Sequence, residues 1–305
     1  MVSLMAIASS NGETKTYKLY FLGGQSNMVG YGYVAQLPVD FKRGMAGVMI
    51  FDGQSAFDDE RQGGIGIWAP LQPGFGYGFQ TNGQTNSLSD RFGPELSFGR
   101  ALSANHPDVG IALVKYALGG SGLAPGVGLG SWHPTDRNGH QVNQFDHALR
   151  TLENALSNRD IDGDGIYDHL VPAGIIWMQG ESDADGSQAA EAYDENLAQL
   201  MQSLRAALGD ENLPVVIGKI TDSGMADDGS VMDYIDIVQQ AQASFAAADH
   251  CAELVSETDS LSYRDDQYHY DTEGFIRLGE AFAEAVLRLE DKCQSIQKNE
   301  KNAAF

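Results

Sequence analysis

Short apolar segments alternate with amphipathic ones along most of this chain, and that alternation is the feature that most constrains its fold. The apolar runs are rich in β-branched residues, and most lack the two-residue alternation of a half-exposed strand, which is typical of strands buried on both faces. They lie at residues 17–22, 46–51, 109–118, 171–178 and 213–220. The intervening patterns, such as 193–208 and 275–289, place apolar side chains on one face of a helix. The alternation predicts an α/β fold, a three-layer α/β/α sandwich around a central parallel sheet with ligands beyond the carboxyl ends of its strands.

The chain is long enough to form one large α/β domain with a substantial core. We expect a single domain over residues 17–292, an N-terminal extension over 1–16 and a polar, frayed tail over 293–305. Residues 53–93 break the strand and helix pattern, since they are rich in Gly, Asn, Gln and Ser with aromatic residues between them. Long segments of this kind are often functional. We therefore predict an ordered insertion there.

The strong negative charge limits the possible partners. A net charge of -23 would repel phosphate backbones and anionic lipid surfaces, which excludes nucleic acid as a partner and favours a neutral substrate. No stretch approaches the roughly 18 to 20 apolar residues of a membrane span, so no membrane partner is expected. The oligomeric state is left open.

Two features bear on the cellular compartment. The first ten residues resemble a shortened export signal without its basic segment. Cys251 and Cys293 fit either one disulfide or two separate buried thiols. We expect a secreted or periplasmic protein, with a cytoplasmic location left open.

The chemistry is suggested first by the motif GGQSNMVG at residues 23–30, which directly follows the first predicted strand and places Ser26 on an exposed turn. A serine hydroxyl becomes a good nucleophile only when a base accepts its proton. The segment DDQYHYDTEGF at 265–275 offers one, because Asp266 and His269 are three residues apart and the carboxylate can orient the imidazole. The G-x-S-x-G motif of the α/β-hydrolase elbow is absent, which disfavours that fold.

Two further motifs follow strands whose ends are expected near Ser26. They are GGSGL at 119–123 and QGESD at 179–183. A glycine amide and a glutamine side chain in these positions can stabilise an oxyanion beside the amide of the serine.

Taken in order, GGQSNM, GGSGL, WMQGESD and DQYH resemble the sequence blocks of carbohydrate esterase family 6 and the sialate O-acetylesterase-like branch of the SGNH/GDSL hydrolases, over residues 17–290. The resemblance implies the flavodoxin-like SGNH fold, with Ser26 as nucleophile and His269 as base. It also implies an oxyanion hole formed by the amides of Ser26 and Gly120 and the side chain of Gln179.

The resemblance leaves two candidate carboxylates to orient the histidine, Asp266 and Glu181. We favour Asp266; Glu181 either shares the role or only braces its loop. Met178 departs from the pattern, because many relatives carry a histidine before QGE.

Four residues are expected to bind substrate: Gln25, Asn27, Trp68 and Trp132. The tryptophans, like Phe75, Tyr77 and Phe79, fit two interpretations. Aromatic faces either line a sugar cleft or pack the insertion against the sheet.

The resemblance implies a serine esterase that removes O-acetyl groups from carbohydrate, an acetylxylan esterase or similar, through an acyl-enzyme and without a cofactor for catalysis. The alternatives are a sialate O-acetylesterase, a general short-chain carboxylesterase, or a carbohydrate-binding protein on a decayed hydrolase fold. An acetylated carbohydrate is the expected partner.

A separate metal motif occurs in DIDGDGIYD at residues 160–168. It resembles a calcium loop, although position 12 is Val171 where an EF-hand requires Glu. Structural calcium is expected there, the alternative being a solvated acidic turn. The predicted ligands are Asp160, Asp162, Asp164, the backbone carbonyl of Ile166, and Asp168.

Overall fold

The structure is a computed structural model that describes residues 13–303 except Asn138 and Asp228, with side chains described up to Cys293. The predicted export segment and most of the predicted N-terminal extension lie outside the described residues.

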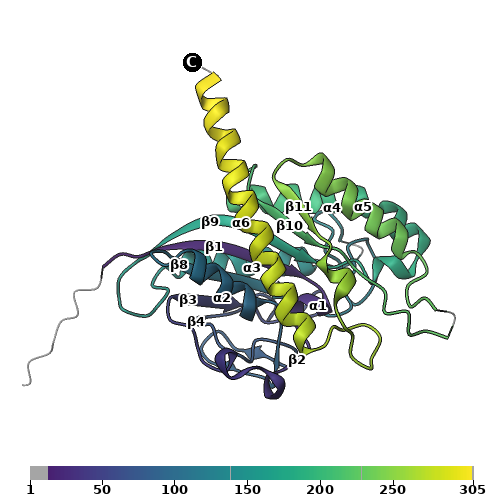
Figure 1. Ribbon diagram of the computed structural model, residues 1–305, viewed down its shortest axis with the longest axis horizontal. Helices are drawn as coiled ribbons and strands as arrows, with labels where there is room; N and C mark the ends of the chain where they lie inside the picture. The colour runs from purple at the N-terminus through teal and green to yellow at the C-terminus, as the bar shows by residue number, and fades with distance from the viewer. Residues whose placement is uncertain (1–12, 138, 228, 304–305) are drawn as a thin grey trace, which may run out of the picture.

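A seven-stranded sheet forms the centre of the molecule, in the order β11-β10-β9-β1-β8-β3-β4 (Figure 1). All neighbouring strands are parallel except β3 and β4, which are antiparallel. Without β3 and β4 the order is that of a flavodoxin-like sheet, 2-1-3-4-5. The predicted α/β sandwich is confirmed, with an antiparallel edge strand added. The strands are β1 Thr16–Gly24, β3 Val48–Asp52, β4 Trp68–Pro70, β8 Gly110–Ala117, β9 His169–Met178, β10 Val215–Gly218 and β11 Ala252–Val255.

Helices cover both faces of the sheet, because a buried parallel sheet needs apolar cover on each side. Helices α2 and α6 pack against each other on one face, where Phe98 of α2 meets Tyr20 of β1. The other face carries α3, α4 and α5, where Tyr193 of α4 lies against Trp177 of β9. The helices are α1 Ser26–Val29, α2 Glu95–Asn105, α3 Gln144–Ser157, α4 Ser187–Leu208, α5 Ile235–Ala248 and α6 Thr272–Ala303.

The predicted insertion forms the connection from β3 to α2. It contains β4 and two small antiparallel elements, one internal and one that pairs with the segment after Ser26. Their strands are β2 Gly32–Tyr33 with β7 Arg91–Phe92, and β5 Gln80–Thr81 with β6 Asn86–Ser87. The insertion thus reaches the carboxyl ends of the strands.

The C-terminal region differs from the prediction. Helix α6 continues to Ala303 where a frayed tail was expected from residue 293, and it projects from the body of the protein (Figure 1). Residues 293–303 contain no Gly or Pro to stop the helix. Cys293 on α6 forms a disulfide with Cys251, directly before β11, so the structure pairs the two cysteines.

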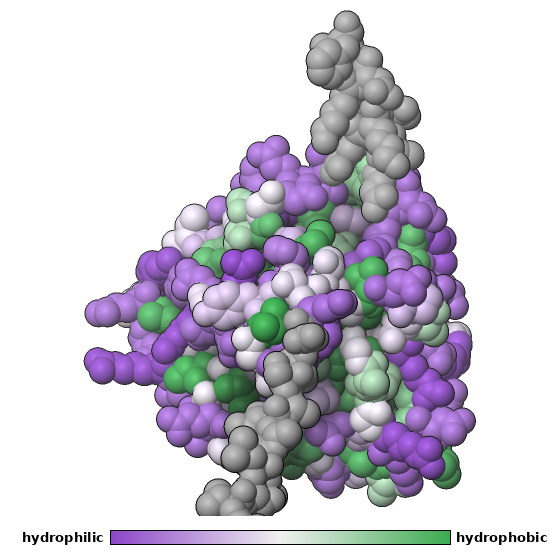
Figure 2. All heavy atoms as spheres, turned by 90° about the vertical axis from the view of Figure 1, so that its left-hand side faces the viewer, coloured by the Kyte–Doolittle hydropathy of each residue, from purple (hydrophilic) through white to green (hydrophobic). Residues whose placement is uncertain are grey.

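Figure 2 views the side of the molecule on which β1 begins, and hydrophilic residues cover most of that face. This agrees with the net charge of -23. None of the helices in the described part of the chain is long and apolar enough to cross a membrane.

Candidate active site

A cavity of about 640 Å³ lies at the carboxyl ends of the central strands. Five of the predicted site residues line it: Gln25, Ser26, Gly120, Glu181 and His269. They come from segments that follow β1, β8 and β9 and from the loop before α6. The position agrees with the rule that ligands bind beyond the carboxyl ends of parallel strands.

A tight turn positions Ser26. Gly24 has φ +148°, and a Cβ atom there would lie 2.0 Å from the carbonyl oxygen of Met178, so only glycine fits. The N–H of Gln25 then donates to that oxygen over 2.9 Å. The chain turns at once into α1, and Ser26 lines the cavity although it is only 7% exposed.

Asp266 orients His269. Oδ2 of Asp266 lies 2.9 Å from Nδ1 of His269, and its Oδ1 accepts the backbone N–H of His269 over 3.0 Å. An ionised carboxylate only accepts hydrogen bonds, so the proton is on Nδ1 and the lone pair of Nε2 is free. Ser26 and His269 are not hydrogen-bonded to each other in this structure, and such pairs often close to bonding distance only with substrate.

The pair is electrostatically prepared for base catalysis. Burial, as the largest cause, lowers the pKa of His269 below its usual value, against the opposing effect of Asp266, so the imidazole is neutral near pH 7. Burial acts to raise the pKa of Asp266, but hydrogen bonds from His269 and from backbone amides outweigh it and keep that pKa low.

Tyr31 holds the histidine ring and was missed by the sequence reasoning. Its ring stacks on His269 with a centroid distance of 3.7 Å and an interplanar angle of 10°. Tyr77, from the insertion, stacks on the other side of Tyr31 at 4.6 Å. The only signal in the sequence was that Tyr31 follows the serine motif directly.

Two backbone amides meet the needs of an oxyanion hole. Gly119 packs against Ser26, because a Cβ atom on Gly119 would lie 3.7 Å from that of Ser26. Gly120 has φ +70°, in the left-handed region that favours glycine. The N–H groups of Ser26 and Gly120 have no hydrogen-bond acceptor among the described residues, and both residues line the cavity.

Gln179 is placed differently from the prediction. Its side chain is fully buried and does not line the cavity. Nε2 donates to Oδ2 of Asp183 over 2.6 Å and to the carbonyl of Ser121 over 3.3 Å, which uses both amide hydrogens. Asp183 also accepts the N–H groups of Leu123 and Ala124. In this geometry Gln179 ties two loops together and has no donor left for an oxyanion.

Glu181 lines the cavity and is hydrogen-bonded to Asn27, which lies behind it. Nδ2 of Asn27 donates to Oε1 of Glu181 over 2.9 Å and to the carbonyl of Tyr268 over 3.1 Å, while its Oδ1 accepts from the N–H of Tyr270. Asn27 was predicted to bind substrate, but in this structure it is buried and does not line the cavity. No contact between Glu181 and His269 is recorded within the described chain. These contacts agree with the bracing alternative, and the role of Glu181 stays a prediction.

The predicted aromatic residues separate into two groups. Trp132 is fully buried between Tyr116 and Trp177, and Trp68 donates to the carbonyls of Ala155 and Asn158 at the end of α3. Neither lines the cavity, and these contacts agree with the packing interpretation for both tryptophans. The insertion instead lines the cavity with Phe75, Tyr77 and Phe79. Gln25 lines the cavity, and its predicted contact with substrate stays a prediction.

The acidic loop lies before β9, at the other end of the strands. Ligand atoms of Asp160, Asp162 and Asp164 lie within 4.8 Å of one another, and Oδ1 of Asp160 is buried without a hydrogen-bond partner. These three carboxylates fit a calcium ion. The ammonium of Lys15 already contacts Asp162 and Asp164.

Asp168 is directed elsewhere. It is fully buried and accepts the N–H groups of Lys15 and Ile161, so it is not a ligand in this arrangement. Calcium at the other three carboxylates stays a prediction.

Comparison with known families decides the classification. The model of the family described as carbohydrate esterase, sialic acid-specific acetylesterase matches residues 16–288. The chain belongs to this family. A probable carbohydrate esterase of Arabidopsis thaliana is 30% identical over 113 residues, which are 37% of this chain and 39% of that protein. The match thus spans well under half of the curated relative.

Several solved structures have the same fold as this chain. A protein from Arabidopsis thaliana has a TM-score of 0.61 at 21% identity, covering 90% of this chain and 99% of its own. A carbohydrate acetylesterase from Xanthomonas citri has a TM-score of 0.61 at 17% identity, covering 90% and 56%. NanS has a TM-score of 0.59 at 16% identity, covering 90% and 98%.

Proposed function

We propose that this carbohydrate esterase is a serine enzyme that removes O-acetyl groups from a carbohydrate such as acetylated xylan. The observation that carries the proposal is the convergence of Ser26, the pair of Asp266 and His269, and the free amide of Gly120 on one cavity. Acyl transfer uses a nucleophile, an oriented base and an oxyanion donor, and these residues offer one of each.

The proposed reaction has two halves. Oγ of Ser26 attacks the ester carbonyl while Nε2 of His269 takes its proton, and the imidazolium then returns that proton to the departing sugar oxygen. Water, deprotonated by His269, attacks the acetyl-enzyme and releases acetate. The proton passes back to Ser26 as the C–O bond to the enzyme breaks. Asp266 stabilises the imidazolium in both halves.

Two amides would hold the negative charge of the tetrahedral intermediate, those of Ser26 and Gly120. Removal of one oxyanion donor typically costs about 3 to 4 kcal/mol of barrier. Because Gln179 bonds Asp183, which in turn holds the loop after Gly120, we assign Gln179 the task of keeping that loop in place.

The test is covalent labelling by a fluorophosphonate, followed by peptide mass spectrometry and by acetate release from acetylated xylan, O-acetylated sialic acid and a p-nitrophenyl ester chain-length series. We expect the adduct on Ser26 and the fastest release from acetyl esters of sugars. Ser55→Ala is the matched control, because Ser55 also lines the cavity but its Oγ donates to the carbonyl of Ala117. If the fluorophosphonate labels the protein at another residue and leaves Ser26 unmodified, the mechanism is refuted.

A further inference from the structure

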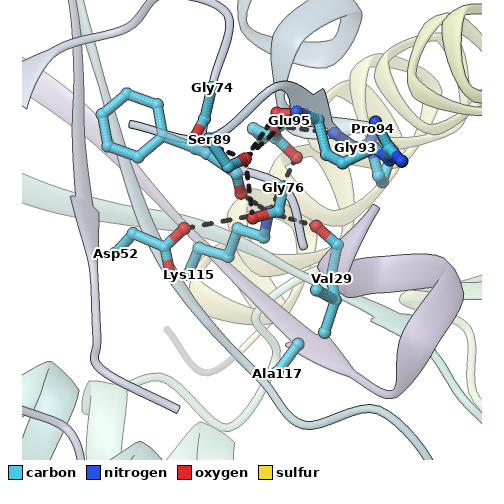
Figure 3. Close-up of polar contacts among 12 residues, drawn as sticks. Val29, Asp52, Gly74, Gly76, Ser89, Gly93, Pro94, Glu95, Lys115 and Ala117 are labelled. Carbon is cyan, nitrogen blue, oxygen red and sulfur yellow. Dashed lines mark hydrogen bonds and ion pairs between the residues drawn. The ribbon is translucent and has the colours of Figure 1, made fainter. Parts of the chain in front are cut away.

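A buried ion cluster lies beside the catalytic cavity, under the insertion (Figure 3). Its centre is Lys115 of β8, which is 2% exposed and lines the cavity. Nζ of Lys115 donates to Oε2 of Glu95 over 2.9 Å and to the carbonyls of Val29 and Phe75 over 2.9 and 2.6 Å. These bonds use all three hydrogens of the ammonium. Lys115 therefore brings a positive charge to the wall of the cavity but has no hydrogen left to donate to a ligand.

Asp52 is the member of the cluster that has no hydrogen bond. It ends β3, is 6% exposed and lines the cavity. Its Oδ2 lies 3.8 Å from Nζ of Lys115, beyond hydrogen-bond distance, and no donor to its carboxyl group is found within the described chain. Because this carboxyl group lies on the cavity wall and accepts no hydrogen bond from the protein, its oxygens can accept hydrogen bonds from the hydroxyl groups of a ligand.

The surroundings of Asp52 agree with this. Burial, as the largest cause, raises the pKa of Asp52 to about 7, Lys115 lowers it, and Glu95 raises it. These are the two charged groups that face it. Lys115 is shared between Glu95 and Asp52 and compensates Asp52 only in part, so the Asp52 carboxyl group is partly ionised near pH 7.

The charges of the cavity disfavour an acidic ligand. Among the described lining residues, three carboxyl groups, those of Asp52, Glu181 and Asp185, accompany the single ammonium of Lys115. Because that ammonium has no free hydrogen, a ligand carboxylate would receive no hydrogen bond from a cation here, and any of the three carboxyl groups that is ionised would repel it.

We propose that Asp52 is a subsite for paired hydroxyl groups of a neutral O-acetylated sugar and that it discriminates against acidic sugars such as sialic or uronic acids. The inference rests on the proposed esterase function and deepens it. β3 is two strands from β1, a separation of roughly 10 Å across the sheet, so Asp52 contacts a part of the sugar remote from the acetyl group. Its two oxygens match the two hydroxyls of a vicinal diol.

The test compares Asp52→Asn with the native protein on three esters: an acetylated xylo-oligosaccharide, an O-acetylated sialic acid and p-nitrophenyl acetate. For the neutral sugar we expect KM to rise about tenfold with kcat unchanged, the effect of about one hydrogen bond. The value of kcat/KM for p-nitrophenyl acetate should stay within about twofold, because this ester does not reach Asp52. The native protein should favour the neutral sugar over the acidic one, and Asp52→Asn should narrow that preference.

Asp90→Asn is the control, since Asp90 is an exposed carboxylate outside the cavity. An unchanged KM for the neutral sugar in folded Asp52→Asn protein, or a native preference for the sialic acid ester, would overturn the subsite. The preference of the native protein between the neutral and the acidic sugar ester is measured without a variant. It therefore tests the subsite even if Asp52→Asn fails to fold.

Absence of native activity on every ester would refute the proposed function instead. Calorimetric binding of the deacetylated xylo-oligosaccharide then tests the subsite alone. Weaker binding by Asp52→Asn supports it, and equal binding, or no binding by the native protein, rejects it.

Discussion

The two ends of the central sheet both carry clustered carboxylates, in opposite environments. At the carboxyl ends of the strands, Glu181 is buried and burial raises its pKa. At the amino ends, Asp164 accepts a hydrogen bond from the N–H of Ile166 and contacts Lys15, and these interactions lower its pKa. Burial therefore disfavours the charged form of the carboxyl group at one end of the sheet, whereas hydrogen bonds and a cation stabilise the charged form at the other end. The difference predicts that substitutions at the carboxyl ends change turnover, while those at the amino ends change stability.

Replacement of the nucleophile should have the largest effect. Ser26→Ala and His269→Ala should each lower kcat on acetyl esters by at least about 10⁴-fold, and the double variant should lose scarcely more, because the two residues act as a unit. Melting temperatures should stay close to that of the native protein. Near-normal turnover by folded Ser26→Ala protein would refute the serine mechanism and the contrast between the two ends.

The two carboxylates near the histidine should differ in effect. Asp266→Asn should cost about 10²- to 10⁴-fold in kcat, since it removes the charge that stabilises the imidazolium. Glu181→Gln should cost less, because Glu181 contacts Asn27 and not His269. Steady-state kinetics of both variants decide this. A larger loss in Glu181→Gln would reverse the assignment.

The pH profile sharpens the same assignment. Only neutral His269 acts as a base, so kcat/KM should fall as pH drops through a pKa below the usual 6.5 of histidine. Asp266 raises the pKa of His269. In Asp266→Asn that pKa should therefore be lower, and the residual activity should fall only at a still lower pH. A limb that shifts upward in this variant would contradict the orienting role of Asp266.

The disulfide should affect stability and leave turnover alone, because Cys251 lies before β11, far from the carboxyl ends of the strands. It closes a loop with a sequence separation of 42 residues. The chain-entropy model assigns such a loop about 4 kcal/mol. Cys251→Ser with Cys293→Ser should lower the free energy of unfolding by up to that amount. Two free thiols in the denatured, unreduced native protein would show that the bridge does not form.

The acidic loop should give the smallest effect. Calcium at about 100 times its dissociation constant would add about 2.7 kcal/mol to stability. Chelation should lower the melting temperature, and calcium but not magnesium should restore it. Asp162→Ala with Asp164→Ala should make the melting temperature insensitive to chelator.

Lys15→Gln should tighten calcium binding, because it removes the competing ammonium. If the melting curve is unchanged after chelation and elemental analysis finds no metal, the calcium prediction is refuted. The loop is then an acidic turn that contacts Lys15.

Local patterns in the sequence determined the layers of the fold and the contact between Asp266 and His269. Strand and helix periodicities depend on neighbouring residues, so they predicted β1, β8 and β9 closely and the existence of α4 and α6, but not the full length of α6. Asp266 and His269 are three residues apart, and the loop that holds them brings them into contact without help from distant segments. The turn at Ser26 was likewise readable from its glycines.

Only the tertiary structure decided which polar groups stay free for a ligand. Gln179 and Asn27 carry donors that suit a substrate, yet partners from other strands and loops occupy those donors. Asp52 has no such signal in the sequence. It lines the cavity because it ends β3, and it receives no hydrogen bond from Lys115 because that ammonium donates to Val29, Phe75 and Glu95. Hydrogen-bond capacity is a property of the residue, but its availability depends on which groups face that residue across the fold, and sequence spacing does not encode this.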